Sequence, residues 1–140
     1  TAGYDGEESD NIKAITEQDQ QLTEVACEDG RVAVLMVHSA ASARRASESG
    51  CVDLVLSGHL HRQVGPDVVE GEDGPTTTLT TGSTGGAVYT FALGSKLRRP
   101  AQVTVVTFRD GRPVGLQPVT FEPGGAIDVA DYTRVRTSPR

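Results

Sequence analysis

The sequence predicts an α/β fold in which a βαβ unit continues into antiparallel strands. Residues 32–37 and 52–56 are apolar runs, the second interrupted only by Asp53, and such runs are typical of strands buried on both faces. The second half of the chain carries further strand-like runs separated by turn sequences. Because 140 residues are enough for one modest core, we expect a single domain over residues 1–140.

The first half is predicted to begin with a loop and a helix. Residues 1–9 are rich in Gly, Glu and Ser and are expected to form a flexible end. Asp10 is a candidate N-cap for an amphipathic helix over residues 11–27, whose apolar side chains recur at roughly helical spacing: Ile12, Ile15, Leu22 and Val25. Residues 40–49 are compatible with a short helix closed by Gly50. A strand, a helix and a strand joined by short connections predict a βαβ unit with parallel strands.

The second half is predicted to be rich in strands. Its strand-like runs are Val64–Glu70, Thr76–Thr81, Ala87–Phe91, Val103–Phe108 and Val114–Phe121. The turn sequences between them are Glu72-Asp73-Gly74, Gly82-Ser83-Thr84-Gly85-Gly86 and Asp110-Gly111. An Asp-Gly pair between two apolar runs favours a β-hairpin. Residues 131–140 are rich in Arg and Thr and are expected to form a second flexible end.

The composition argues against some classes of protein. A formal net charge of −6 argues against a sequence-independent grip on nucleic acid. No stretch approaches the roughly 20 apolar residues of a membrane helix, so we expect this chain to be soluble. The location of the whole protein stays open, since it could be cytoplasmic or anchored to a membrane through a segment upstream of Thr1.

Two cysteines, Cys27 and Cys51, are too few for a disulfide framework, and neither belongs to a C-x-x-C pair. We expect both to be small, buried apolar side chains. The alternative is a single bridge, which would imply an oxidising compartment.

All three histidines lie between residues 38 and 61. His38 ends the first buried strand, and His59 and His61 follow the second. If the two strands are neighbours, the imidazoles meet at the carboxyl edge of the sheet, where open α/β sheets bind ligands. In extended backbone, His59 and His61 would project toward one face, with Gly58 leaving room for a sharp turn. Neutral imidazole is a common ligand of divalent metals, so this edge is a candidate metal site.

Other candidates are weaker. The turn over residues 82–86 could cradle a phosphate with its amides, but it lacks the Lys and the spacing of a P-loop, and a tight turn explains it. Ser57 has no nucleophile-elbow pattern around it. Arg62 is a candidate contact for a substrate phosphate because it follows His61, whereas Arg44 and Arg45 are expected to lie on a solvated face.

The segment from Val32 to Gly65 resembles the late half of calcineurin-like metallophosphoesterases. In that family a strand ends in a metal-binding His, a short helix follows, and a second strand delivers a G-H-x-H motif, here Gly58-His59-Leu60-His61. The resemblance extends over roughly residues 10–122. It implies a sandwich of two β-sheets flanked by helices, of which this chain would form the second half.

The resemblance also implies roles for the histidines. His38 and His59 would bind one metal of a dinuclear centre, and His61 would bind the other, the metals being Mn, Fe or Zn. The implied activity is hydrolysis of phosphomonoesters or phosphodiesters by metal-activated water in the full-length protein.

The family's earlier motifs, D-x-H, G-D and G-N-H-D/E, do not occur in this sequence. They supply the bridging carboxylate, so we expect the chain alone to bind metal weakly or not at all and to be inactive, with no catalytic residues beyond the metal ligands. Its partners would be a phosphate-ester substrate and the missing amino-terminal half of the same fold. Without that half, exposed sheet edges are expected to make the chain a homo-oligomer.

Two alternatives stay open at the level of the sequence. One is a mononuclear zinc hydrolase or lyase, in which His38, His59 and His61 form a three-His site with an open position. The other is a non-enzymatic, β-rich interaction domain whose histidines are structural.

Overall fold

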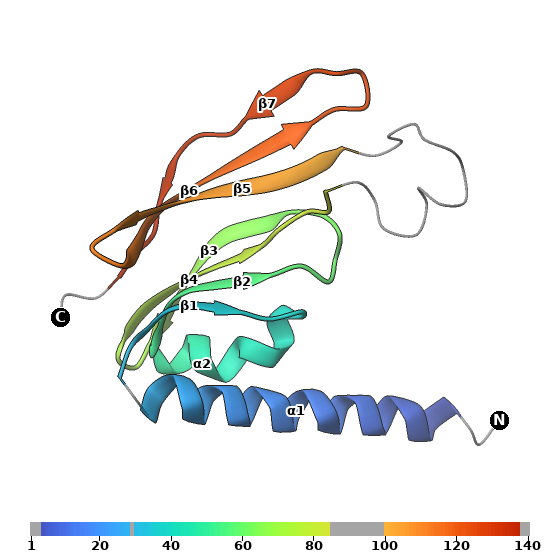
Figure 1. The fold of residues 1–140 in the computed structure, drawn as a ribbon. Helices are drawn as coiled ribbons and strands as arrows, with labels where there is room; N and C mark the ends of the chain where they lie inside the picture. The colour runs from blue at the N-terminus through green and yellow to red at the C-terminus, as the bar shows by residue number, and fades with distance from the viewer. Residues whose placement is uncertain (1–3, 29, 85–99, 138–140) are drawn as a thin grey trace.

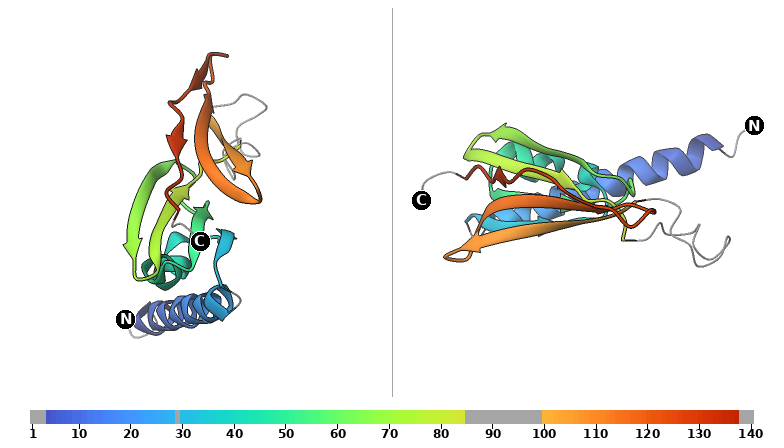
Figure 2. Two further views of the ribbon diagram at one scale, coloured as in Figure 1. Left: turned by 90° about the vertical axis from the view of Figure 1, so that its left-hand side faces the viewer. Right: turned by 90° about the horizontal axis from the view of Figure 1, so that it is seen from above.

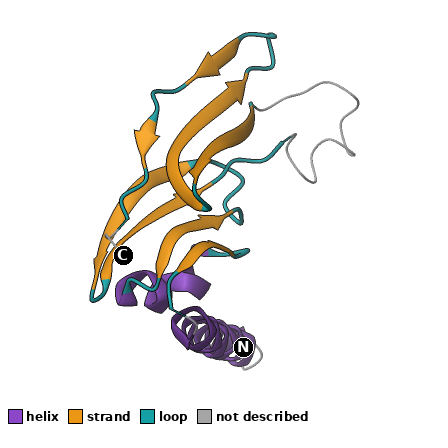
Figure 3. Ribbon diagram, turned by 60° about the vertical axis from the view of Figure 1, so that its left-hand side comes forward, coloured by secondary structure: helices purple, strands orange, loops and turns teal. Residues whose placement is uncertain are grey.

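The chain is a mixed α/β protein built from two helices and two β-sheets, which a computed structural model describes for residues 4–28, 30–84 and 100–137. The elements form three layers: the helices α1 (Tyr4–Glu28) and α2 (Arg44–Ser49), a first sheet, and a second sheet (Figure 1). Both helices lie on the same side of the first sheet, and the second sheet covers its other side (Figures 2 and 3). The strand expected over Ala87–Phe91 lies outside the described residues.

The first sheet, called sheet A here, has the strand order β1-β2-β4-β3. Its strands are β1 (Val32–Met36), β2 (Val52–Ser57), β3 (Val64–Gly71) and β4 (Gly74–Thr80). Strand β2 is parallel to both β1 and β4, and β3 is antiparallel to β4. A 3₁₀ turn over Ala40–Ala43 and α2 connect β1 to β2, so the predicted βαβ unit is confirmed.

The second sheet, called sheet B here, is antiparallel throughout. It contains β5 (Ala101–Arg109), β6 (Arg112–Phe121), β7 (Ile127–Val129) and β8 (Thr133–Arg134), and both β7 and β8 pair with β6. The predicted hairpin joins β5 to β6 through Asp110 and Gly111, whose φ angles of 51° and 76° fit a type I′ turn.

Regular secondary structure extends into both stretches that the sequence suggested would be flexible. Helix α1 begins at Tyr4, within the stretch expected to be a loop, and a sequence rich in Asp and Glu suits the first turns of a helix. At the other end β8 pairs with β6, within the stretch expected to be flexible. Val135 anchors this stretch, since it is only 8% exposed in the core between the sheets and its N–H donates to the Val114 carbonyl at 3.2 Å.

Two apolar clusters hold the layers together. The cluster between the helices and sheet A contains Ala26, Ala43, Ala46, Val52 and Val55. The cluster between the sheets contains Leu54, Leu79, Leu116 and Val135. Strand β2 thus supplies apolar side chains to both layers, Val52 and Val55 to one and Leu54 to the other, which is why its sequence reads as an apolar run rather than an alternating one.

The expectation that both cysteines are free apolar side chains is wrong. Cys27 and Cys51 form a disulfide, with their Cα atoms 5.2 Å apart, and the bridge ties the end of α1 to the start of β2. The two residues are 24 positions apart in sequence, and their pairing could be seen only once the helix had been placed on the sheet.

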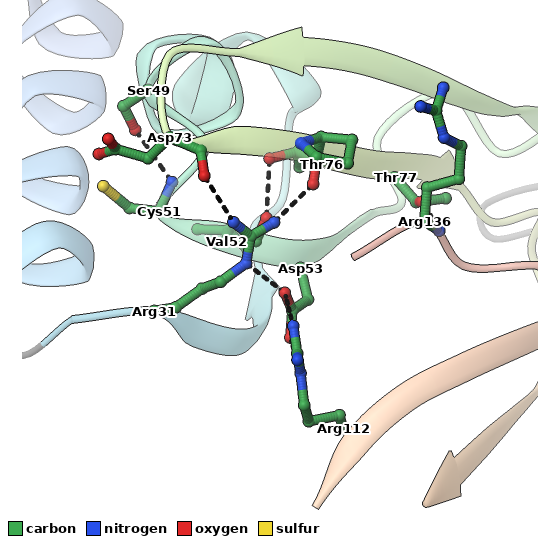
Figure 4. A network of polar contacts seen from close by, with 11 residues as sticks. Arg31, Ser49, Cys51, Val52, Asp53, Asp73, Thr76, Thr77, Arg112 and Arg136 are labelled. Atoms are coloured by element: carbon green, nitrogen blue, oxygen red, sulfur yellow. Dashed lines mark hydrogen bonds and ion pairs between the residues drawn. The ribbon is translucent and has the colours of Figure 1, made fainter. Parts of the chain in front are cut away.

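A buried carboxylate links the two sheets (Figure 4). Asp53 on β2 is fully buried and accepts hydrogen bonds from Arg112 Nε and Nη2 on β6, at 3.0 and 2.9 Å, and from Arg31 Nε. Arg31 also donates to the Pro75 carbonyl at 2.6 Å, which extends the network to β4. The hydrogen bond to Asp53 raises the pKa of Arg112, against the lowering effect of its burial. Asp53, the charged residue that interrupts the buried run of β2, is therefore part of an ion-pair network that stabilises the fold.

Among the described residues, no helix has the length and apolar character needed to cross a membrane.

Candidate metal centre

The carboxyl edge of sheet A gathers three strand ends. Strands β1, β2 and β4 run in one direction and end at Met36, Ser57 and Thr80. His38 lies two residues beyond β1, and His59 lies two residues beyond β2. The parallel pairing of β1 with β2 therefore delivers both side chains to the same edge of the sheet.

Backbone hydrogen bonds fix the two histidines relative to each other. The His38 carbonyl accepts the Gly58 N–H at 3.2 Å and the His59 N–H at 2.9 Å. The preceding Val37 N–H donates to the Leu56 carbonyl at 3.0 Å, which continues the ladder of the parallel pair past the end of the strands. The backbone thus holds His38 against His59 before any ligand is present.

The imidazole rings of His38 and His59 are in direct contact. His38 Nε2 and His59 Nδ1 are 2.9 Å apart, within hydrogen-bond distance, and the rings meet edge to face with centroids 4.8 Å apart. Both side chains are exposed. A metal that binds two nitrogens at about 2.1 Å each, with an angle of roughly 90–109° between them, places those nitrogens about 3.0–3.4 Å apart. The observed 2.9 Å is a hydrogen-bond distance just below this range, so the two nitrogens would have to move slightly apart to bind one metal ion.

The third histidine, His61, follows His59 in a turn and not in the extended backbone that was expected. The Gly58 carbonyl accepts the His61 N–H at 3.0 Å, so residues 58–61 form a reverse turn. His61 itself has a φ of 52°, in the left-handed region that few non-glycine residues occupy, whereas Gly58 has no positive φ. The expected extended backbone over residues 59–61 is therefore wrong, because these residues lie in a reverse turn.

Within residues 4–28, 30–84 and 100–137, no three His, Cys, Asp or Glu side chains cluster as a potential metal site. The structure brings His38 and His59 together and leaves His61 at the end of the neighbouring turn.

The remaining candidates lie around this edge. Arg62 is exposed beside His61. Ser57 is buried and its Oγ lies 2.8 Å from Thr80 Oγ1, so it is engaged within the sheet. Arg44 is exposed and pairs with Glu48 at 2.7 Å, as expected for a solvated face.

Sequence reasoning missed a cavity on the helical side of this edge. It has a volume of about 300 Å³ and lies between the segment 40–48 and strands β3 and β4. Its lining includes the apolar residues Val55, Val64, Val69 and Leu79. These residues come from the three strands β2, β3 and β4, and they face the segment 40–48 only when the helix lies on the sheet, so no local pattern signals the cavity.

No protein-family model, curated protein or solved structure matches this chain.

Proposed function

We propose that this chain is the carboxyl-terminal portion of a calcineurin-like metallophosphoesterase and that it supplies the imidazole ligands of a dinuclear metal centre. The observation that carries the proposal is the pairing of His38 Nε2 with His59 Nδ1, 2.9 Å apart at the carboxyl edge of a parallel strand pair. The G-H-x-H sequence places His61 one turn further along the same loop.

In this proposal His38 and His59 bind one divalent metal, and His61 binds the second. Mn, Fe or Zn would suit the nitrogen ligands. Such metals supply Lewis-acid activation of water and stabilise charge on the phosphate. The side chains of this chain would hold and orient the metals, and Arg62, exposed next to His61, would contact a phosphate oxygen of the substrate, a phosphomonoester or phosphodiester.

The remaining ligands must come from another part of the protein. The sequence contains none of the D-x-H, G-D or G-N-H motifs that would supply a bridging carboxylate. Among the described strands, β1 is at an edge of sheet A and β5 is at an edge of sheet B, so both sheets could be extended by further strands. An amino-terminal half of the same fold would pair there and complete the centre, and without it we expect the chain to be inactive.

The same open edges carry the proposal that the isolated chain self-associates. Met36 on β1 is 77% exposed and Val105 on β5 is 51% exposed, and each strand lacks a second neighbour among the described strands, an arrangement that favours pairing with another chain. Light scattering on the purified chain is expected to show a homo-oligomer. A monodisperse monomer across the accessible concentration range would contradict this.

Metal titration tests the ligand assignment. Addition of Zn²⁺ to the purified chain, followed by NMR of the imidazole signals, is expected to shift His38 and His59 together with a weak affinity. The His38→Ala and His59→Ala variants are each expected to lose this response, and His61→Ala, the matched control, is expected to retain it. An unchanged response in His38→Ala would refute the pairing.

The same titration separates the alternatives. One tightly held zinc that requires all three histidines equally would favour a mononuclear three-His enzyme. No response at any histidine would favour an interaction domain with structural histidines. The coding sequence upstream of Thr1 gives an independent test, because a D-x-H, G-D and G-N-H series is expected there and its absence would sink the phosphoesterase proposal.

A further inference from the structure

The side chain of Gln102 connects sheet B to the loop that carries His59 and His61. Gln102 lies near the start of β5 and is half-buried. Its Oε1 accepts the backbone N–H of Gln63 at 3.0 Å, and its Nε2 donates to Thr120 Oγ1 on β6 at 3.3 Å. Both ends of the amide are therefore engaged, one with the loop and one with the neighbouring strand of sheet B.

Gln102 also contacts the segment that follows β4 at the same edge of sheet A. Its backbone N–H donates to the Ser83 carbonyl at 2.9 Å. A Cβ on Gly82 would meet Gln102 Oε1 and would lie 2.5 Å from Gln102 Cβ, so only glycine leaves room for this side chain. Gly82 has no positive φ, so its lack of a side chain is needed for this close approach and not for its backbone conformation.

At its far end the loop runs directly into β3, where Val64 pairs with Thr80 on β4. The His61 N–H bonds to the Gly58 carbonyl within the turn itself, and the Gln63 side chain bonds to the Gly65 carbonyl two residues away at 3.4 Å. These contacts shape the loop locally and do not connect it to the rest of the fold. Within the described part of the chain, the hydrogen bond from the Gln63 N–H to Gln102 ties the loop to sheet B, two residues after His61.

We propose that Gln102 is a positioning residue that holds the turn bearing His61 in place relative to the pair formed by His38 and His59. The inference rests on the proposed function, since it assigns Gln102 to the support of the same metal centre. In a dinuclear site the two sets of ligands must keep a fixed spacing, and outer residues that fix ligand geometry commonly change metal affinity or activity when replaced.

Three variants isolate this role. Gln102→Ala removes both side-chain hydrogen bonds. Gln102→Glu keeps an acceptor for the Gln63 N–H and can accept the Thr120 hydroxyl, so it is the conservative rescue. Gln117→Ala is the matched control, because Gln117 also lies in sheet B but its side chain donates to the Ala130 carbonyl.

Hydrogen exchange of the Gln63 amide tests the contact without any metal. In Gln102→Ala it is expected to exchange roughly five- to tenfold faster, the factor that the loss of one hydrogen bond produces. Gln102→Glu and Gln117→Ala are expected to match the wild type. Gly82→Ala, which pushes against Gln102 from the other side, is expected to reproduce the Gln102→Ala result. Unchanged protection of Gln63 in Gln102→Ala overturns the inference.

Paramagnetic broadening by Cu²⁺ tests the positioning role. In the wild type a substoichiometric addition is expected to broaden the signals of His38, His59 and His61. In Gln102→Ala the broadening at His61 is expected to fall while that at His38 and His59 is retained, and Gln102→Glu is expected to restore it. Equal broadening at His61 in all variants would show that Gln102 does not position His61, and it would overturn the inference. Absence of broadening at His38 and His59 in the wild type would instead overturn the proposed function.

Discussion

Replacing Asp53 by Asn tests whether the buried carboxylate holds the two sheets together. Asparagine has nearly the same shape, so the substitution removes the negative charge without opening a cavity. Asp53 is fully buried and its carboxylate accepts three guanidinium hydrogen bonds, one from Arg31 and two from Arg112. After the change those guanidinium groups face a neutral amide that can accept fewer of their hydrogen bonds.

The expected cost follows from burial. Removing one partner of a buried ion pair typically costs about 3–5 kcal/mol. The Arg31 and Arg112 side chains keep 12% and 21% of their exposure, so water can hydrate part of their charge. We therefore expect Asp53→Asn to lower the free energy of unfolding by about 2–4 kcal/mol. This is a large part of the roughly 5–15 kcal/mol that a domain has.

Urea denaturation followed by circular dichroism measures this loss. The matched control is Glu70→Gln, which neutralises the ion pair between Glu70 and Arg136, whose side chains are 66% and 56% exposed. An exposed pair contributes about 0–1 kcal/mol, so the control is expected to stay close to the wild type. Equal stabilities for Asp53→Asn and Glu70→Gln would refute the argument that burial gives this network its strength.

Three further predictions concern the helix, a turn and the histidine loop. Replacing both Cys27 and Cys51 by Ser is expected to lower the free energy of unfolding by about 3 kcal/mol, because their bridge closes a loop with a sequence separation of 24, and the difference should vanish when both proteins are measured under reducing conditions. Gly50→Ala is expected to lower the free energy of unfolding, measured by urea denaturation, by about 3 kcal/mol or more, because the new Cβ would lie 2.5 Å from a backbone atom of the β3–β4 turn. Gly111→Ala is the control at nearly the same φ but in open space, and it is expected to lower that free energy by about 1 kcal/mol. Equal losses in the two variants would contradict the steric argument. His61→Gly is expected to keep or raise the free energy of unfolding by up to about 1 kcal/mol, since it relieves a positive φ, and a clear loss of stability would show that the imidazole serves the fold.

Patterns local in sequence predicted much of the fold. The apolar runs predicted both β1 and β2 as strands. Only β2 is buried along most of its length, as a strand covered on both faces would be, whereas β1 is half-buried and its Met36 is 77% exposed. The Asp110-Gly111 pair predicted a hairpin because a type I′ turn needs positive φ at both central residues. The encounter of His38 with His59 followed from the parallel direction of two neighbouring strands.

Features that depend on distant contacts were not predictable in this way. Arg31 and Arg112, the partners of Asp53, lie 22 and 59 positions away in sequence. A charged residue inside an apolar run does not indicate which residue will neutralise it. The turn at His61 depends on one backbone hydrogen bond that the G-H-x-H pattern does not specify. The acceptor for the Gln63 N–H is Gln102, 39 residues further along the chain, and it became visible only when sheet B had been placed against the loop.

The disulfide between Cys27 and Cys51 would keep the chain in one piece after a single proteolytic cleavage between them. The residues between the two cysteines include β1, His38 and α2. A protease that cleaves once within this stretch leaves two pieces joined by the disulfide, so α1 and the rest of the protein migrate as one species until a reductant is added. Bridges of this kind persist in oxidising compartments, where secreted proteases also act. A single nick in this region would therefore be invisible on a non-reducing gel, and the helix would stay tethered to the sheet that it covers.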